Sequence, residues 1–364
     1  MTTATTTAAE QTADQLIERL LNDAIAAMET YSITLGLTLG LYQALAAGET
    51  DARQLAERAG IHPRYAREWL EHQAVLGILQ TDDADVDPYA RVFRLPDAHR
   101  EVLLDDQSPS YFGLMPGLIT GLADVLPQLA DAYRSGGGVP FHAYGEPLRH
   151  GIAGLNRPMY RSQLGDWLAA LPDIQQALAT DGGGILDLGC GTGSSTLTLA
   201  ELFPNAQVHG VDLDTASVAE AREQAKAAGL NDRVTFTNAD AASLNGNGSY
   251  QLVCVFEAFH DMADPIATLR AARALLAPGG AVLIGDERVA ERFAPNGDWL
   301  EQLNYGFSVL HCLPATRAEG TAVEAGTVIR PGTVAQYAEK AGFRSTVLPI
   351  EHDLWRFYRL DPVA

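Results

Sequence analysis

A chain of 364 residues is longer than one hydrophobic core usually organises, and its 47% hydrophobic content is ample for packed domains, so two domains are expected. The formal net charge of −21 opposes binding to nucleic acid phosphates or to an anionic membrane surface, and neither is expected as a partner. Cys190, Cys254 and Cys312 show no C-x-x-C spacing. Their pattern argues against a disulfide framework or a zinc ribbon, and it fits a reducing cytoplasm.

The N-terminal segment begins with a polar tract of small residues, and residues 1–12 are predicted to be a disordered tail. No basic residue precedes Arg19, so a secretory signal is not expected. Apolar side chains then recur every three or four positions from Leu16 to Met28, which predicts a helix with one buried face. The run 33–47 is shorter than the roughly 20 residues that span a bilayer, and it is predicted to be a buried or interface helix.

Two short helices around a tight turn are predicted next, because Thr50 can cap the first helix and Pro63 can open the second. Segment 79–95 is predicted to be a β-ribbon, so residues 13–105 have the organisation of a winged helix-turn-helix domain. Arginines and carboxylates balance between residues 51 and 72. The basic stripe of a DNA-reading helix is missing, and dimerisation or substrate covering is favoured over DNA binding.

The rest of the chain changes from a helical connector to alternating strands and helices. Residues 106–165 contain several proline and glycine breaks and are predicted to be a connector or a lid over substrate. From Gly184 onward short apolar strands alternate with helices, which is typical of a mostly parallel sheet covered on both faces. Residues 166–364 are therefore predicted to form a doubly wound α/β domain.

A glycine-rich turn follows the first strand of this domain in "ILDLGCGTGSSTLTLA". Such glycines let the backbone approach a ligand closely, and the helix that begins at Ser194 or Ser195 offers unpaired N–H groups. Asp212 and Asp240 are expected to end the second and third strands. Because carboxyl ends of parallel strands face one crevice, Asp212 can accept ribose hydroxyls there and Asp240 an adenine amino group.

With Asp187 ahead of the glycines, this run resembles the S-adenosylmethionine-binding motif of class I methyltransferases. The resemblance implies a seven-stranded Rossmann-like sheet whose glycine loop holds the methionine part of the cofactor. The implied cofactor residues are Asp187, Gly189, Gly191, Gly193, Asp212, Asp240 and Ala241. The winged-helix segment narrows the likeness to the small-molecule O-methyltransferase-like group, which implies a small-molecule acceptor and a homodimer built through the N-terminal domain.

A histidine–aspartate pair follows the fourth predicted strand in "VCVFEAFHDMADP". His260 and Asp261 begin the H-D-x-x-D pattern that this group carries at its catalytic histidine. Methyl transfer is an in-line displacement, so the protein mainly orients the acceptor and removes its proton. An imidazole with a pKa of about 6.5 suits that task. The resemblance implies His260 as the general base, and Glu287 is predicted to orient it through a hydrogen bond.

A second histidine, His311 in "SVLHC", opens an alternative in which a metal takes part. Two histidines and a carboxylate can form a facial triad with open positions for substrate, and His260, Asp261 and His311 are such a set. "EAFHDMADP", "SVLHC" and "LNRPMY" also resemble a branch that includes iron-dependent C-methyltransferases of aromatic α-keto acids. That resemblance implies iron or another divalent or trivalent metal on these three residues. Packing of His311 in a helix, without a ligand, is the remaining interpretation.

Residues that line the acceptor are expected in the connector and after the fifth strand. They are Tyr144, Asn156, Met159, Tyr160, Trp299 and Tyr305. Core packing competes with substrate contact for both Met159 and Tyr160, and also for the last two aromatic residues. Two alternatives to methyl transfer remain. The protein could be a ligand-sensing regulator, or an enzyme that uses only the positive charge of S-adenosylmethionine and transfers no methyl group.

Overall fold

The computed structural model describes residues 12–82, 85–179, 183–246, 248–320, 323 and 326–363. The predicted disordered tail lies outside the described residues except for Thr12, which caps the first helix. The chain divides into two compact units, Met1–Thr120 and Gly121–Ala364. In the described part of the chain, no helix combines the length and the apolar character needed to cross a membrane.

The first unit is helical and has its own core. Its helices are α1 (Ala13–Thr38), α2 (Leu41–Ala46), α3 (Ala52–Ala59), α4 (Pro63–Val75) and α5 (Asp97–Leu104), with α6 (Met115–Gly121) at the boundary. The buried Tyr42 packs edge-on against Trp69 and donates its hydroxyl to Gln73. Trp69 in turn donates its indole N–H to the carbonyl of Ser32, which ties α4 to the C-terminal half of α1.

Four predictions for this unit need correction. Asp51 rather than Thr50 caps α3, and its side chain accepts from the amides of Arg53 and Gln54. The run 33–47 is not one helix, because Gly40 adopts a left-handed φ of 68° and separates α1 from α2. The wing has no regular strands among the described residues; only the isolated bridges Thr50↔Phe93 and Gln80↔Arg94 form. Aspartate is rare in β-strands, and several aspartates lie in the sequence between these bridges. Their presence explains why no regular β-ribbon forms.

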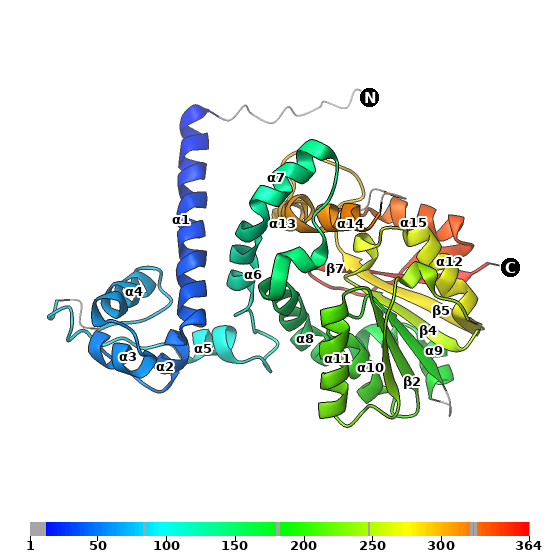
Figure 1. Cartoon of the computed structure of the whole chain (residues 1–364), viewed down its shortest axis with the longest axis horizontal. Helices are drawn as coiled ribbons and strands as arrows, with labels where there is room; N and C mark the ends of the chain where they lie inside the picture. Colours follow the sequence, from blue (N-terminus) through cyan, green and yellow to red (C-terminus); the bar gives the residue numbers. More distant parts are fainter. Residues whose placement is uncertain are drawn as a thin grey trace. The chain divides into compact units, whose positions relative to one another are not determined.

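The apolar face predicted for the first helix is not buried within the chain. Ile17 is 63% exposed and Met28 68% exposed, and the N-terminal half of α1 extends away from the other helices of its unit (Figure 1). The spacing of apolar residues every three or four positions predicted the helix correctly, since α1 spans this region. The spacing does not determine whether other residues of the same chain cover the apolar face of α1.

The second unit is built on one seven-stranded sheet with the order β3-β2-β1-β4-β5-β7-β6. The strands are β1 (Gly184–Leu188), β2 (Gln207–Asp212), β3 (Val234–Asn238), β4 (Tyr250–Phe256), β5 (Leu276–Glu287), β6 (Phe343–Val347) and β7 (Trp355–Pro362). The first five pair in parallel, and β7 pairs antiparallel with both β5 and β6. The mostly parallel doubly wound sheet predicted from the sequence is confirmed.

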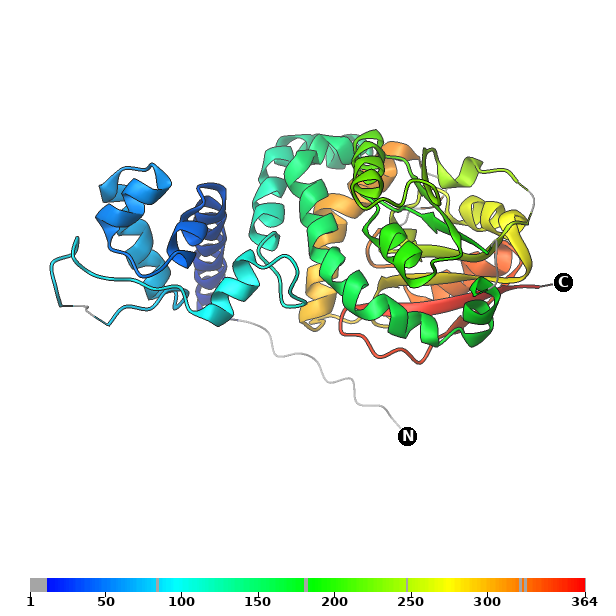
Figure 2. The ribbon, with the colours of Figure 1, turned by 90° about the horizontal axis from the view of Figure 1, so that it is seen from below.

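Helices cover both faces of this sheet (Figure 2). One buried cluster joins α8, α9, α10 and α11 to side chains such as Cys254 and Phe357. A second cluster joins α12 and α15 to alternate side chains such as Val253 and Tyr358. The helices of this unit are α7 (Leu126–Ser135), α8 (Gly145–Ala169), α9 (Pro172–Leu178), α10 (Ser194–Leu202), α11 (Thr215–Ala227), α12 (Pro265–Leu275), α13 (Trp299–Phe307), α14 (Leu313–Glu319) and α15 (Pro331–Lys340). With both faces covered, the ligand crevice falls at the carboxyl ends of the parallel strands.

Candidate active site

The glycine loop lies between β1 and α10 and is fixed by its neighbours in the sheet. Gly189, Gly191 and Gly193 have φ values of 73°, 53° and 88°. The amide of Gly189 donates to the carbonyl of Val211 at 2.8 Å, and the amide of Gly191 donates to Asp212 Oδ2 at 2.7 Å. The second strand therefore sets the position of the loop.

Asp187 is buried beneath this loop and holds the first turn of α10. Its Oδ2 accepts hydrogen bonds from the hydroxyls of Ser195 at 2.7 Å and Thr196 at 2.6 Å. Burial raises the pKa of Asp187 to about 6, and these two hydroxyls oppose the rise. Its side chain thus organises the loop from within.

Two hydroxyls of the loop have no partner of their own. Thr192 Oγ1 and Ser194 Oγ are buried and make no hydrogen bond among the described residues. Buried polar groups are normally hydrogen-bonded, so a pair of orphans at a helix N-terminus fits a polar ligand there. The site fits the amino-acid part of the predicted cofactor.

The two carboxylates predicted to hold the rest of the cofactor differ in their surroundings. Asp212 ends β2 as predicted, and its Oδ1 also accepts the amide of Asp214 at 2.8 Å. Burial raises its pKa. Asp240 lies beyond the end of β3 rather than at it, because the strand stops at Asn238; it caps a 3-10 turn that begins at Ala241.

His260 is held in a 3-10 turn, Phe259–Asp261, directly after β4. The side chain is 3% exposed, and its Nδ1 lies 2.5 Å from Asp286 Oδ1, while its backbone amide donates to Asp286 Oδ2 at 3.0 Å. Burial lowers the pKa of His260, but the carboxylates of Asp286 and Asp261 outweigh it and hold the pKa well above the usual value. The other ring nitrogen, Nε2, lies 3.4 Å from Asp261 Oδ1.

The prediction that Glu287 orients His260 is wrong by one position. Asp286, not Glu287, makes the hydrogen bond. Successive strand residues point to opposite faces, and β5 is buried on both, so no sequence pattern distinguishes the two carboxylates. Burial and the nearby Glu257 raise the pKa of Glu287 well above its usual value.

Glu257 is a site residue that the sequence analysis did not single out. It has a left-handed φ of 49°, is held by its amide to the carbonyl of Gly285, and accepts a hydrogen bond from Asn156 Nδ2. Burial raises its pKa to about 7. Strained non-glycine backbone of this kind clusters at functional sites, but it leaves no pattern in a sequence.

His311 lies in a π-helical turn, Ser308–Cys312, between α13 and α14. It is 2% exposed, and its ring packs edge-on against Tyr144 and Phe141. Burial lowers its pKa, and its Nε2 is buried without a partner among the described residues. Turns of this type are frequent at functional sites.

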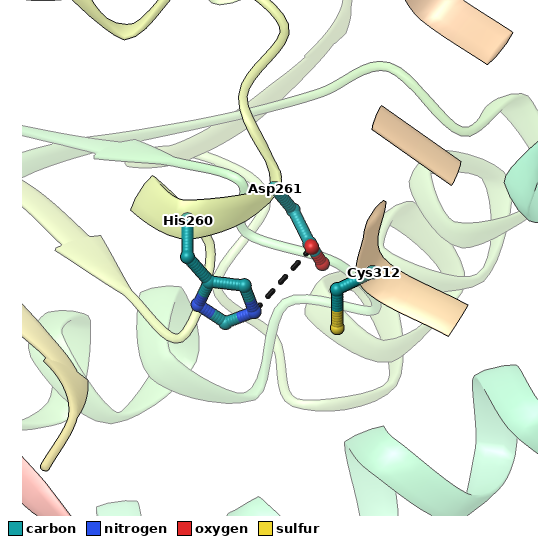
Figure 3. Close-up of side chains that lie close together, drawn as sticks. All are labelled: His260, Asp261 and Cys312. Carbon is teal, nitrogen blue, oxygen red and sulfur yellow. Dashed lines mark ion pairs between the residues drawn. The ribbon is translucent and has the colours of Figure 1, made fainter. Parts of the chain in front are cut away.

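The predicted metal triad does not form as a set. In the described part of the chain, the group whose ligand atoms all lie within 4.8 Å of one another is His260, Asp261 and Cys312 (Figure 3). His311 is outside this group, and its Nδ1 lies 3.3 Å from the sulfur of Cys312. Burial, together with Asp261, raises the pKa of the Cys312 thiol to about 12.

The six predicted acceptor residues lie in three different surroundings. Tyr144 is buried and donates its hydroxyl to the carbonyl of Leu310 at 2.9 Å, and Asn156 contacts Glu257. Met159 and Tyr160 pack in the core, with Tyr160 against Trp167 and Phe256. Trp299 is 61% exposed, and Tyr305 accepts a hydrogen bond from Arg330. Tyr144 therefore lies beside His311, and Asn156 lies beside Glu257.

Two family models match the chain at the positions of its two units. Residues 23–104 match the Rv2258c-like winged HTH domain, and residues 185–280 match the Methyltransferase domain. This chain contains a class I methyltransferase domain behind a winged-helix domain. The matched methyltransferase region includes the glycine loop, Asp212, Asp240 and the His260 turn.

Curated relatives match the chain over part of their length. An uncharacterized protein of Synechococcus sp. is 34% identical over 180 residues, 48% of this chain and 39% of the relative. The 27-O-demethylrifamycin SV methyltransferase of Amycolatopsis mediterranei is 32% identical over 149 residues, 39% of this chain and 52% of the relative. The chain thus spans about half or less of the length of these relatives.

Solved structures match the chain over nearly all of its length. The mitomycin 7-O-methyltransferase MmcR has a TM-score of 0.66 at 22% identity and covers 96% of this chain and 99% of its own. Human N-acetylserotonin methyltransferase has a TM-score of 0.69 at 18% identity, covering 98% of this chain and 100% of its own. At these identities the likeness shows the fold.

Proposed function

We propose that the protein transfers the methyl group of S-adenosylmethionine to a hydroxyl of a small-molecule acceptor, with His260 as the general base. The observation that carries this is the contact between the glycine loop and the His260 turn. A Cβ added at Gly189 would lie 2.4 Å from Cβ of Ala258, two residues before His260. Cofactor loop and base are therefore adjacent, as an in-line transfer requires.

Asp286 gives His260 its orientation in this proposal. A hydrogen bond from Nδ1–H to the buried carboxylate fixes the tautomer and directs Nε2 to the acceptor proton. The neighbouring carboxylate also stabilises the imidazolium that forms when the proton is taken up. Because the same carboxylate holds the pKa of His260 above its usual value, the base acts from its neutral form, whose share increases with pH. Tyr144 and Asn156 are proposed to border the acceptor, because both lie against residues of this site.

The cofactor assignment predicts the effect of removing Asp212. The Asp212→Ala variant should bind S-adenosylmethionine more weakly by about 1–3 kcal/mol, because ribose hydroxyls and the amide of Gly191 lose their acceptor. Titration calorimetry measures this change. Asp232→Ala, a carboxylate in the loop between α11 and β3, is the matched control. No binding of S-adenosylmethionine by the unmodified protein would rule out the assignment.

The exposed apolar face of α1 supports a homodimer built through the N-terminal unit. Leu16, Ile17, Leu20, Leu21, Ile25 and Met28 are all 46% or more exposed. Contiguous exposed apolar surface of this extent marks an interaction site. We expect light scattering to give twice the chain mass of 38.9 kDa and Leu20→Glu to shift the protein to monomer. Val347→Glu, at an exposed position on β6, should not; a monomeric unmodified protein would contradict the proposal.

A second candidate function is metal-assisted C-methylation of an α-keto acid. The grouping of potential ligands around His260 and Asp261 is the observation that favours it. A bound metal would hold the enolate of such an acceptor and acidify the adjacent carbon. Metal analysis of protein purified without chelator or affinity metal tests this candidate, since hydroxyl methylation by His260 requires no metal.

A further inference from the structure

Two buried side chains beside the proposed base carry polar atoms without a partner. His311 and Thr327 are both more than nine-tenths buried, and neither His311 Nε2 nor Thr327 Oγ1 makes a hydrogen bond among the described residues. Buried polar groups are normally hydrogen-bonded, so two such atoms indicate a missing polar ligand. We propose that the methyl acceptor carries a neutral carbonyl group next to its reacting hydroxyl, and that His311 and Thr327 donate hydrogen bonds to the carbonyl oxygen. The acceptor class rests on the proposed methylation of a hydroxyl at His260.

Both side chains lie beside the sulfur of Cys312. His311 Nδ1 is 3.3 Å from it. The chain passes close to the π-helical turn just before Thr327, since a Cβ added at Gly326 would lie 2.7 Å from Oγ of Ser308. Burial raises the pKa of the Cys312 thiol, and the Thr327 hydroxyl opposes that rise from beside the sulfur. The two unpartnered atoms therefore belong to one polar corner of the site.

The protons in this corner make it a donor site. Burial raises the pKa of Cys312 to about 12, so the thiol keeps its proton at neutral pH. Burial lowers the pKa of His311, so its imidazole is neutral and carries one N–H group. When the thiol donates to Nδ1, that N–H group is on Nε2. Nε2–H of His311 and the hydroxyl of Thr327 are then two donors that face the same missing ligand.

The corner is within reach of a small molecule held at His260. A general base lies about 2.6–3.2 Å from the hydroxyl whose proton it takes. Figure 3 shows Cys312 approaching His260 and Asp261, and its sulfur lies within 4.8 Å of a ring nitrogen of the first and a carboxylate oxygen of the second. A hydroxyl and a carbonyl oxygen on neighbouring carbons lie roughly 2.5–3.0 Å apart, the separation of an O–H···O hydrogen bond. One acceptor can therefore present its hydroxyl to the base and its carbonyl to the donors around Cys312.

Charge selects a neutral carbonyl over a carboxylate. Asp261 Oδ1 is buried and has no hydrogen-bond partner in the described part of the chain. Its charge reaches the corner, because it opposes the effect of burial on the pKa of His311. A carboxylate on the acceptor would be repelled by Asp261, and like charges in a buried site are costly. A ketone oxygen accepts the same two hydrogen bonds without that repulsion.

Two isomers test the proposal without turnover. Full-length protein saturated with S-adenosylhomocysteine is titrated in a calorimeter with ortho-hydroxyacetophenone and with para-hydroxyacetophenone, which differ in the position of the carbonyl group. We expect the ortho isomer to bind at least about 10-fold more tightly, because a site built to hydrogen-bond one group discriminates against analogues that cannot present it. Salicylate, with a carboxylate at the same position, should bind at least about 10-fold more weakly than the ortho isomer. Equal binding of the isomers, binding of neither, or tighter binding of salicylate would overturn the proposal.

Two variants assign the donors. Thr327→Val keeps the shape of the side chain, and His311→Phe keeps a ring against Tyr144. Each should weaken binding of the ortho isomer roughly 5- to 10-fold, the loss expected for one hydrogen bond, and change binding of the para isomer less than twofold. Thr268→Val, at a buried threonine of α12, is the matched control. Unchanged binding of the ortho isomer in both variants would contradict the assignment of the donors.

Turnover of the same probes separates the acceptor class from the proposed function. With S-adenosylmethionine, Thr327→Val should raise KM for the ortho isomer and leave kcat within about twofold, because the lost contact holds the acceptor and takes no part in proton or methyl transfer. Methylation of both isomers, bound with equal affinity, would leave the proposed function standing and overturn the acceptor class. Preferential binding of the ortho isomer, with no methyl transfer to any probe, would support the donors and contradict the proposed function.

Discussion

Replacing His260 with alanine is expected to lower kcat for methyl transfer by roughly 10²- to 10⁴-fold, the usual contribution of a general base. Cofactor binding should change little, because the glycine loop and Asp212 do not use the imidazole. Turnover of a phenolic acceptor panel and calorimetry with S-adenosylmethionine measure the two effects. His260→Gln, which keeps a polar side chain of similar reach, should fail in the same way. His150→Ala, at a histidine on α8 that pairs with Glu220, is the matched control.

The Asp286→Asn variant keeps His260 but changes the residue that orients it, so it tests the orientation of the base separately from its presence. The amide keeps the shape but has no negative charge to stabilise the imidazolium, and its NH2 group can favour the wrong tautomer, so kcat should fall while KM for the acceptor stays within about twofold. Glu287→Gln changes the residue first predicted for this role, and it should be milder. Normal turnover in His260→Ala would defeat the base assignment and leave the His260–Asp286 contact as a structural hydrogen bond.

Replacing Gly189 with alanine is expected to damage both the fold and the cofactor site. The added Cβ would lie 2.4 Å from Cβ of Ala258, and φ of 73° is unfavourable for any residue with a Cβ. Backbone strain of this kind costs about 1–3 kcal/mol, and steric overlap adds to it. Thermal unfolding should therefore shift down by roughly 4 °C or more, at 2–4 °C per kcal/mol for a domain of this size. S-adenosylmethionine affinity should fall at least about 10-fold.

The double variant Gly189→Ala with Ala258→Gly tests the cause. Removing the Ala258 methyl makes room for the new one, so part of the lost stability should return while the φ strain persists. Gly332→Ala, where no atom lies within 4 Å of an added Cβ, is the control. If Gly189→Ala were as stable as the unmodified protein, the close approach of loop and turn would not be a real constraint.

The cofactor half of the site was determined by local sequence. "LDLGCGTG" needs a short strand, a turn with positive φ and a helix start, and β1, the loop and α10 supply them in that order. Asp212 ends its strand as predicted, because a parallel sheet places strand ends at one edge. Each of these features depends on residues that are close together in the chain, so the local sequence pattern was sufficient to predict them.

Contacts between distant segments were decided by the tertiary structure. Asp286 rather than Glu287 pairs with His260 because side chains alternate between the two faces of β5, and only the folded sheet determines which face the His260 turn lies against. Cys312 rather than His311 belongs to the ligand group, because the backbone of the π-helical turn Ser308–Cys312 sets the direction of each of its side chains. The exposed face of α1 follows the same logic: periodicity predicts an apolar face, whereas only the packing of the folded chain determines what covers it.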